Sequence, residues 1–474
     1  MMKFDKILRN IAVVTTLITA ASAMGQTVEE ARQLAEDGNI AGAITMLRNV
    51  VAENPKNSEA AAELGVLLYD SGDDAEAEEV LQKARKQGNR DATLALARIA
   101  LGRYDIDEGR ALLAAYRKTL RSGKKVVAED QSENLEDQFD RAERMLDRVQ
   151  NIEVIDSVDV DAEDFFRHYP LSSAAGKLVG SDALPAGFPS DDQTVVHVTG
   201  SGNRMVWAAQ DSEGVSRLYG SSALLDNEWE APEALGDELG EGGDAVYPYM
   251  MPDGVTLYFA NDGENSLGGY DIFLTRKGDD GYLQPANVGM PFNSPYNDYL
   301  LAIDEYTGAG WFVTDRNRHP GKVTIYTFVP QELRVNVDID DPRLTSLARL
   351  DNIALTRKEG KDYSDILRAV KEGRNMGDDA PKTPDFTLSV PGCGVYTALD
   401  DFKSRAARDA MKEYLVKQKK LDGIINRLAD LRESYTRGDR SQRELINTLE
   451  TGLDDARAEL KALRSKVIKL ETGK

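Results

Sequence analysis

A repeat of 52 to 54 residues in the middle of the chain is the feature that most constrains its fold. β-type runs that end in an aromatic residue recur as MVW, LYF and GWF, which places Trp207, Phe259 and Phe312 at intervals of 52 (259 − 207) and 53 (312 − 259). The runs that follow them, RLY, DIF and TIY, keep this spacing. A repeat of this length with several short strands is the size of one propeller blade, a four-stranded sheet packed against the next. The pattern therefore predicts repeated antiparallel sheets between residues 194 and 329.

Three motifs of this repeat carry a family resemblance. The patterns PDG-x-x-LYF, GGYDIF and W-x-x-P-x-x-LG resemble the TolB-like propeller repeats of exported bacterial proteins. The resemblance implies a β-propeller-like domain, for which we expect the bounds 152–335. Three repeats are fewer than the four blades of the smallest closed propeller. The sequence offers two ways to close a ring, an earlier blade that begins near Val154 and a strand pair within residues 386–399.

A second repeat, of 34 residues, precedes the β region. Gly38 and Gly72 are 34 apart (72 − 38), as are Ala31 and Gly65 (65 − 31). Together with the large residues around them, these positions resemble the tetratricopeptide repeat, in which small residues lie where two helices cross closely. The resemblance implies an α-solenoid, for which we expect the bounds 24–151 including a capping helix. Its concave surface would bind a peptide or another protein; the alternative is a spacer that only packs on the next domain.

The last 74 residues, 401–474, have a helical pattern. Apolar residues from Ile446 to Leu470 step by three and four without a break, which is typical of a coiled coil. We expect a coiled-coil hairpin hinged near Gly438, either closed within one chain or self-associating, after a mixed linker at 336–400. In Bacteroidetes-type proteins, repeats like those above sometimes precede a peptidoglycan-binding domain of the OmpA type. Such a domain needs a βαβ pattern, so the resemblance does not extend to peptidoglycan anchoring.

The first 23 residues have the pattern of a secretory signal peptide. Basic residues precede an apolar run, and the segment ends in Ala-Ser-Ala. We therefore expect an exported protein that is located in the periplasm, where it could also lie at the periphery of the outer membrane. We expect no transmembrane segment in the mature chain. The single cysteine, Cys393, excludes an intramolecular disulfide. The formal net charge of −23 argues against nucleic-acid binding.

One loop of the β region combines carboxylates with glycines, as a ligand site or partner site would. It lies between two predicted strands, and we favour a structural bend within one repeat over a ligand site. Its acids lack the DxDxDG spacing of a calcium-binding loop. We therefore expect these carboxylates to be solvated rather than to bind calcium. The candidate residues are Asp262, Glu264, Asn265, Gly268, Gly269, Tyr270 and Asp271.

The chain contains no HExxH, GxSxG, P-loop or Rossmann motif. We therefore predict a protein that is not an enzyme and that uses no cofactor. The predicted function is a periplasmic scaffold or adaptor that binds protein partners in a Gram-negative envelope assembly. The alternative is a carbohydrate-binding or small-ligand-binding protein that uses the propeller funnel, with Trp229, Tyr270 and Tyr282 as stacking residues. Partner identity, the number of blades and the oligomeric state stay open at this stage.

Overall fold

The computed structural model describes most of the chain, in two compact units of residues 1–378 and 379–474. The predicted signal peptide up to residue 22, Cys393 and the predicted hinge at Gly438 lie outside the described residues. The described residues are 23–120, 128–224, 228–240, 242–278, 281–331, 333–375, 388–390, 394–396, 399, 402–436 and 443–472.

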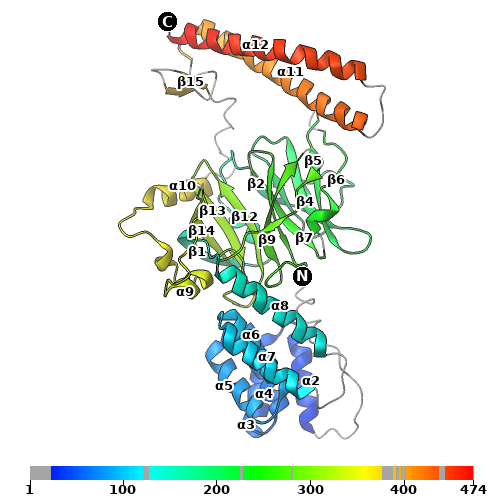
Figure 1. Cartoon of the computed structure of the whole chain (residues 1–474), viewed down its shortest axis with the longest axis vertical. Coiled ribbons are helices and arrows are strands. Elements are labelled where there is room, and N and C mark those ends of the chain that lie inside the picture. Colours follow the sequence, from blue (N-terminus) through cyan, green and yellow to red (C-terminus); the bar gives the residue numbers. More distant parts are fainter. Residues whose placement is uncertain are drawn as a thin grey trace. The chain divides into compact units, whose positions relative to one another are not determined.

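The described part of the first unit begins with seven helices, α2 to α8, of which the first six form three antiparallel pairs (Figure 1). Gly38, Gly72 and Gly88 have positive φ angles of 83° to 86° in the turns between helices. Glycine adopts this conformation without strain and commonly ends a helix, which explains the spacing of Gly38 and Gly72. The helices are α2 (Ala23–Glu36), α3 (Ile40–Glu53), α4 (Ser58–Asp70), α5 (Asp74–Lys86), α6 (Arg90–Gly102), α7 (Ile106–Leu120) and α8 (Ala128–Leu146).

The small residues of the 34-residue repeat lie where helices meet. A Cβ atom added to Gly65 in α4 would lie 2.4 Å from Cγ of Leu81 in α5. One added to Gly109 in α7 would lie 2.1 Å from the ring of Phe139 in α8. The close approach of these helices therefore requires glycine, and α8 lies where the capping helix was predicted.

The other described residues of the first unit include three antiparallel sheets. Their orders are β2-β3-β4-β5-β6, then β10-β9-β8-β7 with β11 on β9, and β1-β14-β13-β12. The strands are β1 (Glu153–Asp161), β2 (Lys177–Gly180), β3 (Val195–Val198), β4 (Arg204–Gln210), β5 (Ser216–Ser222), β6 (Glu233–Ala234), β7 (Ala245–Met250), β8 (Thr256–Asn261), β9 (Asp271–Gly278), β10 (Gly281–Tyr282), β11 (Ala286–Asn287), β12 (Asp298–Asp304), β13 (Ala309–Thr314) and β14 (Lys322–Val329).

Each copy of the longer repeat forms one of these sheets. The aromatic residue of the first motif lies on β4, β8 or β13 and stacks on an aromatic residue directly opposite on the next strand. Such cross-strand pairs stabilise a sheet face. The pairs, with the distances between ring centroids, are Trp207–Tyr219 at 6.0 Å, Phe259–Phe273 at 6.0 Å and Phe312–Tyr326 at 5.3 Å.

One predicted way of closing a ring is wrong, and the other stays a prediction. Val154 begins no earlier sheet, because it lies in β1, which pairs with β14 and completes the third sheet. The strands predicted within 386–399, β15 (Leu388–Val390) and β16 (Gly394–Tyr396), pair with each other in the second unit. The outer edge of β14 would otherwise present unpaired backbone groups, and β1 covers it. The described residues thus form a sheet-rich domain of three sheets, and no closed propeller is detected.

Short helices follow the third sheet and pack against both parts of this unit. Leu347 and Ala348 of α9 (Leu344–Arg349) belong to the same buried cluster as Phe139 of α8. Val370 of α10 (Ser364–Asn375) joins the central cluster of the sheets, which includes Trp311. The 3₁₀ helices are η1 (Phe165–His168), η2 (Ser181–Ala183), η4 (Asp237–Gly240) and η5 (Ile353–Thr356).

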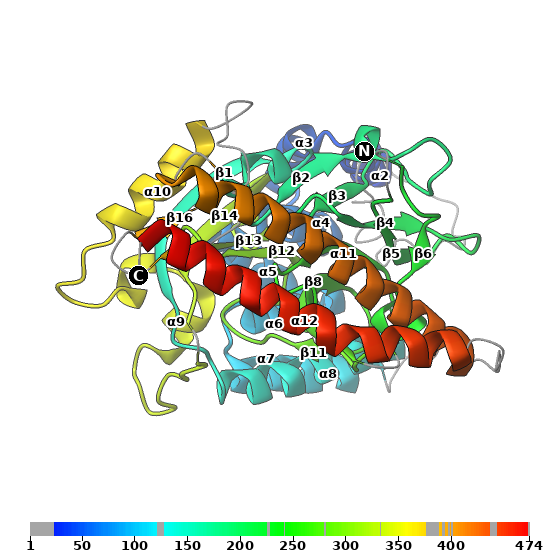
Figure 2. The same cartoon turned by 90° about the horizontal axis from the view of Figure 1, so that it is seen from above.

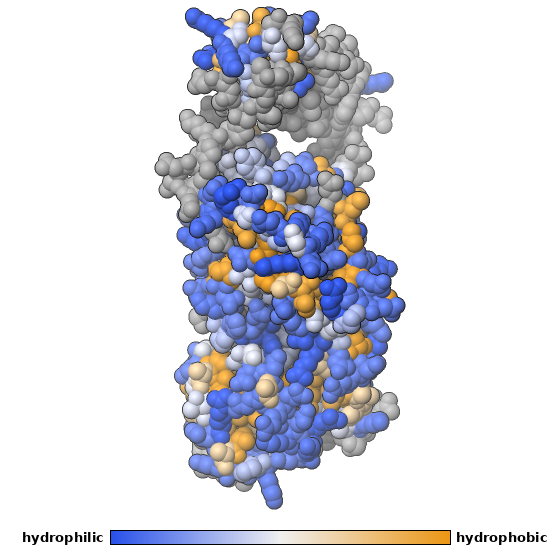
Figure 3. All heavy atoms as spheres, turned by 90° about the vertical axis from the view of Figure 1, so that its left-hand side faces the viewer, coloured by the Kyte–Doolittle hydropathy of each residue, from blue (hydrophilic) through white to orange (hydrophobic). Residues whose placement is uncertain are grey.

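Within the described residues, no helix combines the length and the apolar character needed to cross a membrane. On the face shown in Figure 3, hydrophilic residues cover most of the described surface, and hydrophobic residues lie between them in separate patches.

The second unit contains two long helices, α11 (Arg405–Thr436) and α12 (Arg443–Thr472), which run antiparallel and side by side (Figure 2). Leu460 and Val467 of the predicted seam are buried, as is Leu421 of α11, whereas Leu470 is 37% exposed. The two helices thus form a hairpin, and its description as a coiled coil stays a prediction.

Candidate functional site

The predicted loop is held by bonds that recur elsewhere in the sheet domain. The Asp262 carboxylate accepts a hydrogen bond of 2.6 Å from the backbone N–H of Asp244. Asp315, 53 residues later (315 − 262), accepts the corresponding bond of 2.8 Å from the N–H of Asn297. The same bond in two successive repeats indicates that Asp262 stabilises the repeat.

The glycines of the loop approach the next repeat closely. A Cβ atom on Gly268 would lie 2.1 Å from the carbonyl oxygen of Tyr296, and one on Gly269 would lie 2.1 Å from Oδ1 of Asn297. Tyr270, which is half-buried, donates its N–H to the same Asn297 oxygen at 3.0 Å. These three residues therefore pack the second sheet against the third.

Asp271 is fully buried below the loop. Its carboxylate accepts hydrogen bonds from the N–H of Leu267 at 2.9 Å and from Nδ2 of Asn287 at 2.7 Å. Burial, together with the nearby Asp298 carboxylate, raises the pKa of Asp271 to about 7. Of the seven candidates, only Glu264 and Asn265 are exposed, and a ligand or partner role for the loop stays a prediction.

The tip of this loop contacts the helical repeats. Gln138 of α8 donates to the carbonyl oxygen of Leu267 at 2.9 Å, and Arg141 of α8 donates to that of Ser266 at 3.0 Å. The Leu267 side chain is fully buried in the cluster that contains Phe139. A loop predicted to bind a partner thus joins two parts of its own chain.

A second contact joins the third sheet to the turns of the helical repeats. The guanidinium carbon of Arg318 lies 4.1 Å from the ring centroid of Tyr69 and 5.3 Å from that of Tyr296. Its Nη1 lies 2.7 Å from an Asp74 carboxylate oxygen and donates to the Tyr69 carbonyl oxygen at 2.7 Å. The hydroxyl oxygens of Tyr69 and Tyr296 are 2.5 Å apart.

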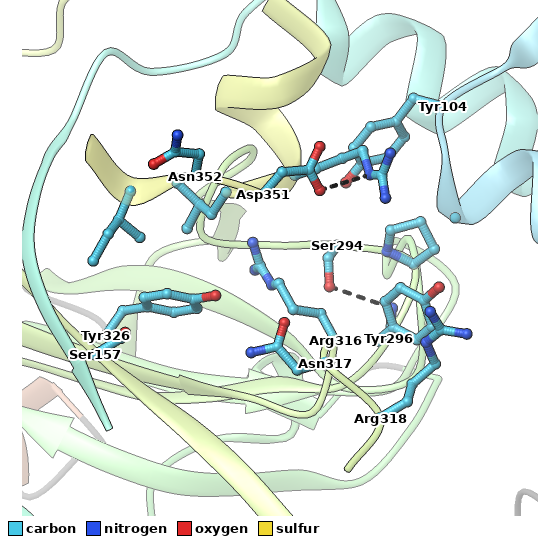
Figure 4. A pocket seen from close by; sticks show the side chains of 15 residues that line it. Tyr104, Ser157, Ser294, Tyr296, Arg316, Asn317, Arg318, Tyr326, Asp351 and Asn352 are labelled. Atoms are coloured by element: carbon cyan, nitrogen blue, oxygen red, sulfur yellow. Dashed lines mark hydrogen bonds and ion pairs between the residues drawn. The ribbon is translucent and has the colours of Figure 1, made fainter. Parts of the chain in front are cut away.

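Beside this contact lies a polar pocket of about 450 Å³, within the usual range for ligand sites (Figure 4). Its walls come from the α6–α7 turn, the loops of the third sheet, β1 and the α9–η5 segment. The lining residues are Gly102, Tyr104, Ser157, Ser294, Pro295, Tyr296, Arg316, Asn317, Arg318, Tyr326, Arg349, Leu350, Asp351, Asn352 and Ile353.

Arg316 lines this pocket and is almost completely buried. Its side chain is 4% exposed, and its Nη2 donates to the fully buried Asp298 carboxylate at 2.7 Å. Arg316 and Arg318 thus both pair with carboxylates. The acid that pairs with Arg318 comes from the helical repeats, which the sequence did not predict. No sequence signal pointed to Tyr104 or to the α9–η5 segment.

The aromatic residues proposed for a funnel have little free surface. Tyr282 is 9% exposed in a core cluster, and Trp229 and Tyr270 are half-buried. Among the residues that the structure describes, no group of three or more His, Cys, Asp or Glu side chains is arranged to hold a metal ion.

Comparison with known proteins assigns the helical region alone. The tetratricopeptide repeat family matches residues 34–92, which run from the end of α2 to the start of α6. No curated protein and no solved structure matched the chain. Because tetratricopeptide repeats form protein-interaction modules, this region indicates a protein partner.

Proposed function

We propose that the protein is a non-enzymatic scaffold or adaptor in a Gram-negative envelope assembly. The observation that carries this proposal is the tetratricopeptide repeat at residues 34–92, since stacked repeats offer an extended concave surface for a protein segment. The sheet domain is fixed to the repeats by Leu267 and Arg318 and supplies a second surface at a constant distance from the first.

The inner row of helices is where we place the partner segment. α4 contacts α6 and α6 contacts α8, so these helices lie on the tighter side of the curve. Arg32 of α2 bonds across this row to Glu59 at 2.8 Å and to Glu63 at 2.7 Å, with Glu29 also paired to it at 3.1 Å. Three carboxylates share one guanidinium, and we therefore expect a partner segment with basic residues.

Affinity capture from an envelope extract tests this proposal. The wild type should recover a stoichiometric protein, and Glu59→Lys should lose it because the substitution reverses a charge on the inner row. Glu79→Lys in α5 is the matched control, since Glu79 is similarly exposed (67% against 65%) but lies on the outer row. Recovery of no stoichiometric protein, or equal loss with both variants, would contradict the proposal.

Export and self-association are part of the same proposal. The signal-like segment supports a periplasmic location, which cell fractionation with an epitope tag measures; a cytoplasmic protein would contradict it. The hairpin of α11 and α12 supports self-association, because large apolar side chains such as Val416 are exposed on it (58%). Light scattering that gives a monomer at all concentrations would argue against this role.

A further inference from the structure

The pocket next to Arg318 contains a buried hydroxyl group that has no partner. Tyr104 is 6% exposed, and no hydrogen-bond partner is found for its Oη among the described residues. Its side chain reaches from the α6–α7 turn into the pocket on the side of Asp351 (Figure 4). A buried tyrosine hydroxyl is usually hydrogen-bonded, and an unpaired one is destabilising. A bound molecule would supply the missing partner.

The backbone around the pocket is strained. Five non-glycine residues have positive φ angles among those described, and three of them, Tyr104 (58°), Arg318 (53°) and Leu350 (58°), line this pocket. They come from three separate parts of the sequence. Bulky residues rarely adopt this conformation, and such strain gathers at functional sites.

The charges on the pocket walls indicate what kind of molecule fits. Every arginine of the lining already faces a carboxylate. The pairs are Arg316–Asp298 at 2.7 Å, Arg318–Asp74 at 2.7 Å and Arg349–Asp351 at 3.2 Å. The walls therefore present hydrogen-bonding groups of both kinds with little net charge, which favours an uncharged ligand over an anion.

The remaining lining groups suit a hydroxyl-rich ligand. Asn317 and Asn352 carry amides, Ser157 carries a hydroxyl and Asp351 is an acceptor, while Tyr326 adds an aromatic ring. Sugar hydroxyls donate and accept in the same way, and their C–H faces pack on aromatic rings. We propose that this pocket binds an uncharged saccharide of one or two units, with the Tyr104 hydroxyl as a binding group.

This inference goes beyond the scaffold role and places the ligand in a pocket between the helical repeats and the third sheet. The pocket walls include Tyr104 from the helical repeats and Arg316 from the sheets. A ligand that contacts both parts would stabilise their docking, so binding should raise the melting temperature of the whole unit.

Tyr104→Phe is the decisive variant, because it removes only the unpaired hydroxyl. Tyr282→Phe is its matched control, since Tyr282 also has a buried hydroxyl without a partner in the described structure and does not line the pocket. Both variants should be at least as stable as the wild type, because each loses a buried unpaired polar atom. Asp351→Asn is a second pocket variant at a residue that is 40% exposed and therefore tolerant of substitution.

The purified protein is titrated by calorimetry with glucose, galactose, N-acetylglucosamine and their disaccharides, and with citrate and phosphate as anions. We expect at least one saccharide to bind saturably, with affinity reduced about fivefold in Tyr104→Phe, the effect of one hydrogen bond, and unchanged in Tyr282→Phe. Asp351→Asn should also weaken binding. The proposal is overturned if no saccharide binds at millimolar concentration, if only the anions bind, or if Tyr104→Phe binds as tightly as Tyr282→Phe.

Discussion

Arg318→Ala should weaken the docking of the helical repeats on the sheet domain. Arg318 belongs to the third sheet region, and its guanidinium lies between the rings of Tyr69 and Tyr296 with a side-chain exposure of 14%. Alanine removes both ring contacts and the bond to the Tyr69 carbonyl oxygen. The positive φ angle of residue 318 (53°) strains the backbone in the wild type and in the variant alike, because alanine also disfavours this conformation.

The magnitude follows from these contacts. Each cation–π contact is worth about 1 kcal/mol when partly desolvated, and a hydrogen bond from a charged donor is worth about 1.5 kcal/mol or more. Asp74 is 33% exposed and regains water, so its ion pair adds less than about 1 kcal/mol. We expect the free energy of unfolding to fall by about 3 kcal/mol.

Urea unfolding with two probes measures this effect. The three tryptophans, at 207, 229 and 311, all lie in the sheet domain and report on it by fluorescence, while far-UV circular dichroism reports mainly on helices. Both transitions should shift together in Arg318→Ala. A double-mutant cycle with Tyr69→Leu should give a coupling of at least about 1 kcal/mol.

Arg217→Ala is the control, because Arg217 is a partly exposed arginine paired with Asp211 inside the first sheet region. It should cost about 1 kcal/mol or less and show no coupling to Tyr69. The reasoning is refuted if the effects of Arg318→Ala and Tyr69→Leu simply add, or if Arg318→Ala is no more costly than the control.

Three further predictions concern stability. Gly65→Ala should destabilise the repeats by about 1 to 3 kcal/mol through contact with Leu81, despite the better helix propensity of alanine, as a thermal melt will measure. Asp298→Asn should cost about 3 to 5 kcal/mol in urea unfolding, since Arg316 stays buried without its carboxylate; a cost below that of Arg217→Ala would contradict this. Burial lowers the pKa of His197 to about 4, so the unfolded state binds the proton more tightly and stability should fall by up to about 3 kcal/mol as the pH drops from 6.5 to 4. His197→Gln should lack this part of the pH dependence in urea titrations, and an unchanged profile would contradict it.

The sequence predicted the repeats because each repeat places a residue under a strict local constraint. Gly38 and Gly72 require a positive φ angle, and Gly65 requires a close helix crossing. Trp207 and Phe259 stack on aromatic partners at the same cross-strand position. Such constraints act over one repeat length and remain visible as a period.

Contacts between residues far apart in the sequence had no such signal. β1 pairs with β14 across more than 150 residues, as Asp161 and Lys322 show (322 − 161 = 161). Arg318 finds Asp74 at a still longer separation, and each of these residues has an ordinary sequence context. The loop of Asp262 left both a site and a structural bend open in the sequence, because carboxylates and glycines form the same pattern whether they bind a ligand or a neighbouring strand.

The packing of the helical repeats on the sheet domain determines which surfaces remain free for partners. The α4–α5 and α6–α7 turns are used by the chain itself, through Tyr69, Asp74 and Tyr104. The tip of the second-sheet loop is used on α8 by Leu267. The inner row around Arg32 and Glu59, where we propose that the partner binds, is not used by these contacts. Because protein binding and saccharide binding then use different residues, Glu59→Lys should leave saccharide affinity unchanged, and Tyr104→Phe should leave partner capture intact.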